Sequence, residues 1–313
     1  MKQREKAAFR QQFLGGLQLC NQQGVPLPGI QDLARREVFI GQLIDSVRRV
    51  QYASVVAKRP INPVRADGLS PLFDPLRAAV LRQHSGNFDE ACWLVFLFVH
   101  FGKHPRSGYR YTREVYSALG QRAPWTFAAV SQDIGGMRAW LNQNEAYLRR
   151  GTGCGFGNHR KYISLSGTKP SGTGSAFATY VQWVQSHGDH HGLIAHAIAQ
   201  APGTPESAFD WSYWSMRSVA SFGRIGRFDY LTMLQKLGFA QLRPASPYLD
   251  GPKDGPTKGA RLMLQGTQRA FSVAELDRRV RVVGQYLGVG MQEMEDSLCN
   301  WQKSPSHYVL FGG

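Results

Sequence analysis

Cysteine is scarce in this sequence, and long apolar runs are missing. The 313 residues contain 4 cysteines, and none of them forms a C-x-x-C pair, so zinc ribbons and disulfide frameworks are not expected. The longest apolar run, residues 91–99, is far shorter than the roughly 18 residues of a membrane span and suits a buried helix. The N-terminus leads into no signal-peptide core. We therefore expect no membrane association and a location in the cytoplasm.

Acidic residues are outnumbered by basic ones. Lys and Arg number 37 and Asp and Glu 22, which gives a net charge of +15. Such an excess favours polyanionic partners through counterion release and electrostatic steering. A basic protein can also be merely soluble, but the arginines cluster in short aromatic-rich segments, which favours the polyanion interpretation. Hydrophobic residues at 42% and aromatics at 12% exclude a disordered chain.

No alternating strand pattern of any length occurs, and the apolar spacing is helical along much of the chain. Helices are expected at residues 32–58, from a cap at Asn87 to Phe101, from a cap at Thr112 to Gly120, and at 177–184, 212–221, 228–237, 258–264 and 272–286. The spacing of Met291, Met294, Leu298 and Trp301 predicts a last helix with one apolar stripe. The sequence therefore predicts an all-α fold, a multi-helix DNA-binding domain.

The arrangement of these helices suggests two ways to divide the chain. Residues 1–86 form an N-terminal helical region and residues 87–313 a helical core, or the two form one continuous domain. Residues 287–290, Leu-Gly-Val-Gly, resemble the hairpin of helix-hairpin-helix DNA binders, in which backbone amides hold a phosphate. A helix-hairpin-helix fold of the glycosylase type is accordingly an option.

Several catalytic motifs are absent. The chain has no GxxxxGK[ST] loop, no GxGxxG opening a βαβ unit, no HExxH and no GxSxG. Four histidines lie close in sequence but lack a completing carboxylate or cysteine pattern, so we interpret them as a solvated helix end rather than as a zinc site: His187, His190, His191 and His196. No metal site is predicted and no cofactor is required, although Mg²⁺ could accompany a phosphate substrate.

Four other segments stand out, at residues 102–110, 157–162, 221–229 and 295–305. Each of the first three combines glycine with two or more cations. Glycine lets the backbone approach a ligand closely, and successive N–H groups can cradle phosphate oxygens. Arginine adds a two-pronged match to phosphate and lysine a point charge. Such loops can instead pair with the chain's own acids, but three of them in one chain favour phosphate binding.

The same blocks carry a family resemblance. The strings 101–104 (FGKH), 156–162 (FGNHRKY), 222–229 (FGRIGRFD) and 295–305 (EDSLCNWQKSP) resemble the signature blocks of the alpha-glutamyl/putrescinyl thymine pyrophosphorylase family of phages. The resemblance runs from about Asp89 to Gly313. The helical module is also similar to that of 5-hydroxymethyluracil DNA kinases, whose P-loop is absent here.

The resemblance implies a step in thymine hypermodification of phage DNA. A kinase first pyrophosphorylates hydroxymethyluracil in DNA, and a family member then displaces pyrophosphate with an amine, such as an amino acid, for example glycine, or a polyamine. The expected partners are DNA with a modified pyrimidine, the free amine, and the upstream hydroxymethyluracil DNA kinase. A phage-encoded enzyme of this kind would work in the host cytoplasm.

Roles for individual residues follow as hypotheses. The general base, or the group that binds the amine, is sought among His159, Asp229, Glu295 and Asp296. Pyrophosphate or DNA phosphate is expected to meet Lys103, His104, Arg106, Arg110, Arg160, Lys161, Arg224, Arg227, Lys258, Arg261 and Lys303. A base edge or a carboxylate is expected to be recognised by Asn158, Tyr162, Asn300, Trp301 and Gln302. For Asp229, a salt bridge to Arg224 or Arg227 is an equally good interpretation.

Two other functions fit the same sequence. A glycosylase-like base-flipping enzyme would suit an all-helical, hairpin-bearing DNA enzyme and would leave an abasic product. A non-catalytic protein that recognises modified DNA would bind with strong salt dependence and form no product.

Overall fold

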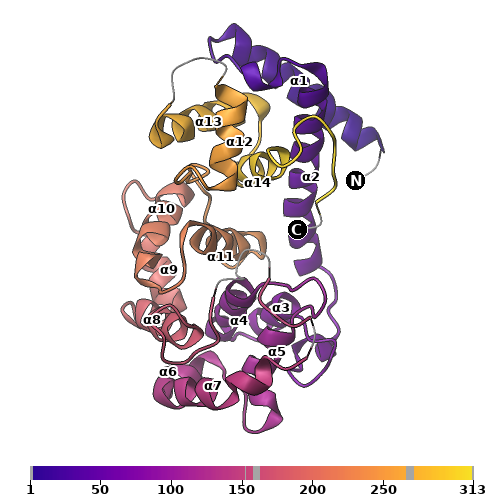
Figure 1. Ribbon diagram of the computed structural model, residues 1–313. Coiled ribbons are helices and arrows are strands. Elements are labelled where there is room, and N and C mark those ends of the chain that lie inside the picture. The colour runs from indigo at the N-terminus through magenta and orange to yellow at the C-terminus, as the bar shows by residue number, and fades with distance from the viewer. Residues whose placement is uncertain (1–2, 152, 158–162, 266–270, 312–313) are drawn as a thin grey trace. The chain divides into compact units, whose positions relative to one another are not determined.

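The computed structural model describes residues 3–151, 153–157, 163–265 and 271–311 (Figure 1). Within these ranges the regular elements are all helices, accompanied by two isolated bridges, His104 to Gly108 and Ser164 to Gly172. The predicted all-α fold is therefore confirmed. The chain divides into two compact units, one of Met1–Ser54 with Pro244–Gly313 and the other of Val55–Arg243.

The first unit, here the terminal unit, joins the two ends of the chain. Its elements are α1 (Gln3–Gln22), the 3₁₀ turn η1 (Pro28–Ile30), α2 (Leu33–Ala57), α12 (Gly255–Leu264), α13 (Val273–Leu287) and α14 (Met291–Trp301). The core includes the predicted stripe of α14, which is buried from Met291 to Trp301. Helices α12 and α14 pack very closely, because a Cβ atom on Gly259 would lie only 2.4 Å from the Leu298 carbonyl oxygen. Glycine is thus required at that crossing.

Helices α13 and α14 are joined by the hairpin at residues 287–290. Gly288 adopts left-handed dihedrals, φ 66° and ψ 38°, and ends α13, and Gly290 begins α14 without a side-chain cap. The amide of Val289 donates to the Gly284 carbonyl at 3.1 Å. A short turn thus joins two helices at the residues whose sequence resembles a helix-hairpin-helix motif, and glycine is favoured at 288 because other residues are strained at positive φ.

The second unit, here the middle unit, is built around α4 (Phe88–Phe101). This helix is apolar on all sides and is buried almost throughout, as expected of a central helix. The surrounding elements are η2 (Pro63–Ala66), α3 (Pro75–His84), α5 (Arg110–Tyr116), η3 (Ala118–Gly120), α6 (Phe127–Gln132), α7 (Ile134–Leu148), α8 (Thr173–Gln185), α9 (His190–Ile198), α10 (Pro205–Ser215), η5 (Met216–Ser218) and α11 (Arg224–Lys236).

Some predicted boundaries differ from the structure. Thr112 does not cap its helix, because α5 already begins at Arg110 and Thr112 is buried within it. Asn87 does cap α4 by accepting the Glu90 amide, but the Glu90 carboxylate binds elsewhere and completes no capping box. The helix predicted at 212–221 is α10, which begins earlier because Thr204 and Ser207 form a capping box and Pro205 occupies its first position.

None of the helices within the described residues is long and apolar enough to cross a membrane. Residues 244–313 cluster with the first 54 residues, and the predicted division at residue 86, with its alternative of one continuous domain, stays a prediction. The C-terminal segment contributes to this clustering: the Gln42 side chain donates to the Val309 carbonyl at 2.8 Å, and the ring of Tyr308 covers Gly41.

Candidate functional site

Two of the predicted glycine-rich segments lie against each other in the middle unit. After α4, Gly102 takes φ 66°, which turns the chain into the loop that carries Lys103, His104 and Arg106. The Gly157 amide donates to the Phe101 carbonyl at 2.8 Å. A Cβ atom on Gly157 would lie 2.9 Å from both the Gly102 Cα and the Lys103 amide nitrogen. The backbones therefore touch at a point that only glycine permits.

The contact between the two segments continues along the loop. A Cβ atom on Gly155 would lie 3.3 Å from the His104 ring, and one on Gly153 would lie 3.0 Å from the Arg106 Cδ. Residues 102–106 of the 102–110 loop are thus backed by residues 153–157. We name these two segments together the paired glycine loops. The sequence predicted each of them separately, and the structure brings them together.

The cations of the paired glycine loops differ in what they contact. Arg110 is held within the protein, because its Nε donates to Glu114 at 2.8 Å and its Nη1 to the Arg150 carbonyl at 2.9 Å. The Glu114 hydrogen bond raises the pKa of Arg110. Lys103 and Arg106 are exposed, and among the described residues neither forms an ion pair. The Lys103 Nζ lies 5.8 Å from the centre of the Tyr109 ring.

His104 has a structural role in the same loop. Its Nδ1 accepts the backbone amides of Arg106 at 3.3 Å and Ser107 at 3.2 Å. The loop is closed by two hydrogen bonds between the backbones of His104 and Gly108, both 2.9 Å. These contacts fix the imidazole as an acceptor at Nδ1 and leave the Nε2 position for a proton.

The segment 158–162 lies outside the described residues. It carries the predicted roles of Asn158, His159, Arg160, Lys161 and Tyr162, which stay predictions. The segment follows Gly157 directly in the chain, and Gly157 contacts the Lys103 loop.

The arginines of the third segment are integrated into the fold. Arg227 is 8% exposed, donates from Nη1 to the Tyr213 carbonyl at 3.1 Å, and lies 4.2 Å from the centre of the Tyr213 ring. Arg224 is 7% exposed on the first turn of α11. Both arginines are thus largely buried in the packing of α11, and the phosphate-binding roles predicted for them stay predictions. Asp229 is half-buried on the same helix.

The fourth segment forms a polar network in the terminal unit, with Asp296 at its centre. One carboxylate oxygen of Asp296 accepts from Arg49 Nε at 2.9 Å, from Arg49 Nη2 at 2.6 Å and from the Ser46 hydroxyl at 2.7 Å. The other oxygen accepts from the Asn300 amide at 2.9 Å, and the Asn300 carbonyl oxygen accepts from Lys303 Nζ at 3.0 Å. The network orders residues from α2 and α14 around one carboxylate.

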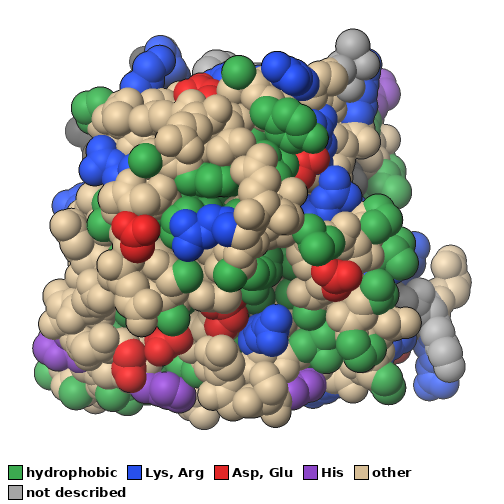
Figure 2. Space-filling model, turned by 90° about the horizontal axis from the view of Figure 1, so that it is seen from below, with side chains coloured by type: hydrophobic (Ala, Val, Ile, Leu, Met, Phe, Trp, Pro, Cys, Tyr) green, Lys and Arg blue, Asp and Glu red, His purple; other side chains and the backbone are tan. Residues whose placement is uncertain are grey.

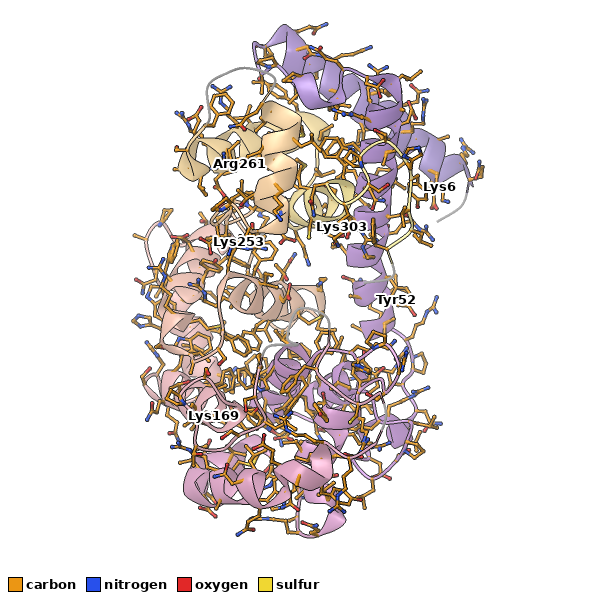
Figure 3. The ribbon with its side chains drawn as sticks, in the orientation of Figure 1. Lys6, Tyr52, Lys169, Lys253, Arg261 and Lys303 are labelled. Carbon is orange, nitrogen blue, oxygen red and sulfur yellow. The ribbon has the colours of Figure 1, made fainter. Side chains whose placement is uncertain are left out.

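The remaining predicted residues of this unit occupy different environments. Trp301 is fully buried, packs edge-on against Phe39, and donates to the Pro305 carbonyl, so it cannot stack on a base as predicted. Asn300 is 7% exposed and is engaged in the network, while Gln302 donates to the Cys299 carbonyl at 3.2 Å. Glu295 is half-buried on α14 and Lys258 is exposed. Lys303 is exposed and Arg261 is half-buried on α12; both are labelled in Figure 3.

Sequence reasoning missed a buried hydrogen-bonded chain in the middle unit. Asp89 accepts from His190 Nδ1 at 2.5 Å and from the His190 amide at 3.0 Å. His190 Nε2 lies 2.7 Å from the Tyr180 hydroxyl, which lies 2.7 Å from the Tyr230 hydroxyl. His190 is 1% exposed and both tyrosines are fully buried. The interpretation of His190 as part of a solvated helix end was therefore wrong.

This chain of hydrogen bonds joins four helices, α4, α8, α9 and α11. Burial lowers the pKa of His190, and the hydrogen bond from His190 lowers the pKa of Asp89. The neighbouring Glu90 joins α4 to α5 and α6, because it accepts hydrogen bonds from the Tyr116 hydroxyl at 2.6 Å and from the Phe127 amide at 2.8 Å. The acidic pair at the start of α4 was visible in the sequence, but its partners are distant in the chain.

Charge alone does not mark a site on the face of the molecule that Figure 2 shows. On the face shown in Figure 2, Lys and Arg side chains are interspersed with acidic and hydrophobic ones. The residues that the structure describes include no group of three or more His, Cys, Asp or Glu side chains arranged to hold a metal ion. Of the predicted phosphate-binding residues, Lys103 and Arg227 belong to the middle unit and Lys303 to the terminal unit, and Arg160 lies outside the described residues.

Comparison with known proteins agrees with the resemblance of the sequence blocks. The sequence model of the alpha-glutamyl/putrescinyl thymine pyrophosphorylase family, clade 3, matches residues 34–313. The chain belongs to this family. The match spans nearly the whole chain and includes the paired glycine loops and the Asp296 network. No curated protein and no solved structure matches the chain significantly.

Family membership also defines the class of activity. The family description indicates a pyrophosphorylase-type enzyme that acts on a modified thymine. In this family member, Lys103 and Arg106 are exposed cations on the paired glycine loops, and in the C-terminal signature block the Asp296 carboxylate accepts hydrogen bonds from Arg49, Ser46 and Asn300.

Proposed function

We propose that this family member is a transferase that displaces pyrophosphate from 5-(pyrophosphoryloxymethyl)uracil in DNA with an amine. The amine is an amino acid such as glycine, or a polyamine, and the product is a hypermodified thymine. The observation that carries the proposal is the pair of glycine loops in a chain of this family, with Lys103 and Arg106 exposed on a backbone that only glycine allows to pack so closely.

The chemistry needs little covalent participation from the protein. The amine nitrogen attacks the methylene carbon attached to the pyrimidine, the carbon–oxygen bond to pyrophosphate breaks, and pyrophosphate leaves with the bonding electrons. The attacking nitrogen loses one proton to a base. Cations near the leaving group stabilise the negative charge that develops on the departing oxygen. Lys103 and Arg106 supply such cations, and Arg is suited to two-pronged contact with phosphate oxygens.

The base that accepts the proton is proposed among the acids and the histidine of the signature blocks. His159 belongs to the segment that follows Gly157, next in the chain to the paired glycine loops. Asp296 is already bonded to Arg49, Ser46 and Asn300, so we assign it the role of ordering the C-terminal block. Asp229 and Glu295 stay candidates.

DNA phosphate is proposed to contact the start of α14. This helix begins at Gly290 without a side-chain cap, so its first turn offers backbone amides of the type that hold a DNA phosphate, whereas the amides of Gly288 and Val289 already donate to the carbonyls of Gln285 and Gly284. The upstream partner in this scheme is a hydroxymethyluracil DNA kinase, because the substrate must already carry pyrophosphate. No cofactor is proposed; Mg²⁺ can escort pyrophosphate, and a reaction run with and without EDTA measures its contribution.

The test is mass spectrometry of nucleosides from pyrophosphorylated DNA that has been incubated with the protein and a mixture of amines. The proposal expects an amine-bearing thymidine and the release of pyrophosphate. A lost base would support a glycosylase-like enzyme, and salt-sensitive binding without any product would support a non-catalytic modified-DNA-binding protein. Either of these outcomes would overturn the transferase. Single amines then identify the donor.

A further inference from the structure

His104 lies in the chain between Lys103 and Arg106, and its imidazole ring is held by the loop that carries them. Nδ1 meets three donors: the Arg106 amide at 3.3 Å, the Ser107 amide at 3.2 Å and the Ser107 hydroxyl at 3.1 Å. The chain fixes the direction of a backbone N–H, so Nδ1 must accept these hydrogen bonds and cannot carry a proton. The imidazole is therefore neutral, with its single proton on Nε2.

The backbone of His104 is fixed as firmly as its ring. Its amide donates to the Gly108 carbonyl and its carbonyl accepts from the Gly108 amide, both at 2.9 Å. The next residue, Pro105, has a restricted φ. Within the ranges that the structure describes, no residue forms a hydrogen bond with Nε2 of His104. The Nε2–H group is thus a donor whose direction is set before any ligand binds, and such preorganised donors are effective in catalysis.

The ring of His104 lies at the contact between the paired glycine loops. Its Cδ2 and Nε2 atoms are on the side of Gly155, where a Cβ atom would lie 3.3 Å from Cδ2 and 3.4 Å from Nε2. The ring is half-buried, whereas Lys103 and Arg106 are exposed. A pyrophosphate group bound by these two cations therefore lies on the loop that also carries the Nε2–H donor.

We infer that His104 is a catalytic residue that donates a hydrogen bond from Nε2–H to the pyrophosphate leaving group, and that it is neither a general acid nor a general base. This inference rests on the proposed function, in which the paired glycine loops receive the pyrophosphate. The basic nitrogen of the ring, Nδ1, is occupied by the loop, so it does not accept the proton of the amine.

The hydrogen bond acts on the charge that develops during the reaction. As the amine attacks, the carbon–oxygen bond breaks and pyrophosphate leaves with the electron pair. The Nε2–H group of His104 stabilises the negative charge on the departing oxygen and keeps its proton, while the proton of the amine goes to a separate base. A neutral imidazole is suited to this role, because it offers a strong hydrogen bond without giving up its proton.

The protonation state of the ring is tested by NMR. Long-range ¹H–¹⁵N spectra of the full chain with ¹⁵N-labelled histidine distinguish a proton on Nε2 from one on Nδ1, and the signal that is missing from a His104→Asn variant identifies His104. We expect the Nε2–H form at neutral pH, and a shift of the Nε2 signal when inorganic pyrophosphate is added. A proton on Nδ1, or an Nε2 signal that saturating pyrophosphate leaves unchanged, would overturn the inference.

Two substitutions separate the two nitrogens of the ring. The amide oxygen of asparagine replaces Nδ1, so His104→Asn keeps an acceptor for the loop and loses the Nε2 donor. The amide nitrogen of glutamine replaces Nε2, so His104→Gln keeps a donor that transfers no proton. His104→Asn should lower the rate of pyrophosphate displacement by about 100-fold, and His104→Gln should stay within about tenfold of the wild type. A His104→Gln variant no faster than His104→Asn would overturn the inference.

Pyrophosphate binding distinguishes a failure of this inference from a failure of the proposed function. In isothermal titrations of the full chain, His104→Asn should bind inorganic pyrophosphate about tenfold more weakly than the wild type. The control His84→Asn, at an exposed histidine that ends α3, should bind it normally. If these differences hold but the wild type forms no amine-bearing thymidine, the proposed reaction fails and the pyrophosphate contact of His104 stands. If His104→Asn transfers the amine at the wild-type rate, the reaction stands and this inference fails.

Discussion

The cations of the Asp296 network and those of the paired glycine loops are used in opposite ways. In the terminal unit, Arg49 binds Asp296 with two of its nitrogens, and Lys303 is held by Asn300. In the middle unit, Lys103 and Arg106 extend from the paired glycine loops, and among the described residues no carboxylate pairs with either of them. The net charge of +15 therefore overstates what is available to a polyanion. Cations bonded within the protein order the fold, and exposed cations without an ion pair are the ones that can bind phosphate.

The largest effect is expected when the two exposed cations of the paired glycine loops are removed together. Lys103→Ala/Arg106→Ala should lower the rate of pyrophosphate displacement by about 100- to 1000-fold, because two charge-assisted contacts of about 1.5–2 kcal/mol each are lost. The melting temperature should hardly change, since both side chains are exposed. Pyrophosphate release and a thermal scan measure the two effects.

The matched control is Arg122→Ala in the same unit. Arg122 is exposed and lies over the Trp125 ring at 3.7 Å, away from the glycine loops in the sequence. Its loss should leave turnover nearly unchanged. If both variants slowed the reaction equally, general electrostatics rather than the paired glycine loops would explain the effect.

The second test concerns the buried hydrogen-bonded groups of the middle unit, Asp89, His190, Tyr180 and Tyr230. No binding function is assigned to them. His190→Leu leaves Asp89 and Tyr180 without their partner inside the unit. We expect a loss of about 3 kcal/mol in the free energy of unfolding, measured by urea denaturation, because unsatisfied buried polar groups are costly. His191→Ala, on the exposed neighbour that contacts the Phe88 ring, should cost less than about 1 kcal/mol. Equal losses of unfolding free energy in the two variants would contradict a stabilising role for the hydrogen bonds of His190.

Acid should destabilise the protein through the same histidine. Burial lowers the pKa of folded His190 below its ordinary value of 6.5. As the pH falls past that value, the unfolded state takes up the proton first, so the free energy of unfolding should decrease below about pH 6.5. The lowered pKa of Asp89 adds a further loss below about pH 4. The His190→Leu variant should lack the first of these slopes, and a wild-type stability that stayed flat from pH 7.5 to 5.5 would contradict the assignment.

A substitution at Asp296 tests whether this carboxylate orders the C-terminal block or acts in catalysis. Asp296→Asn keeps the shape but removes the charge that binds Arg49. Because both side chains are about a third exposed, we expect a loss of only about 1 kcal/mol in the free energy of unfolding. Transfer activity per folded molecule should stay within about threefold of the wild type. A loss of turnover by 100-fold or more in a stable variant would instead identify Asp296 as the general base.

The sequence predicted the helices better than the contacts between them. Periodicity located α2, α13 and α14 to within a residue or two, because amphipathic spacing is local information. The burial of Arg227 and Trp301 was not predicted, since a cation beside glycine and an aromatic beside polar residues look alike in a sequence whether they are buried or exposed. Exposure depends on which distant helix packs against them. The His190 chain was invisible for the same reason, because Asp89 is 101 residues away.

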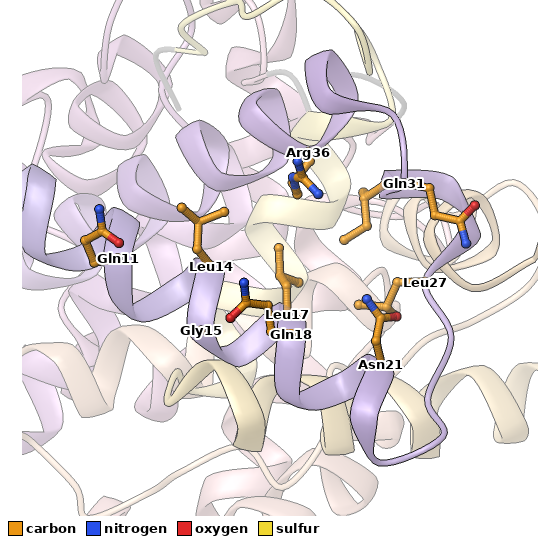
Figure 4. Close-up of a pocket in the computed structure, with 10 residues that line it drawn as sticks. Gln11, Leu14, Gly15, Leu17, Gln18, Asn21, Leu27, Gln31 and Arg36 are labelled. Carbon is orange, nitrogen blue, oxygen red and sulfur yellow. The ribbon is translucent and has the colours of Figure 1, made fainter.

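The smallest predicted effects concern the stability of variants at two neighbouring glycines of α1. Gly15→Ala should raise the free energy of unfolding by about 0.5–1 kcal/mol, since alanine favours the helix and its Cβ atom meets nothing within 4 Å. Gly16→Ala, one residue further along α1, should instead lower it by about 1–3 kcal/mol, because the added methyl group collides with the Tyr286 carbonyl. Urea denaturation of both variants gives the two signs. A destabilising Gly15→Ala would mean that position 15 is packed rather than open to the hollow that Figure 4 shows.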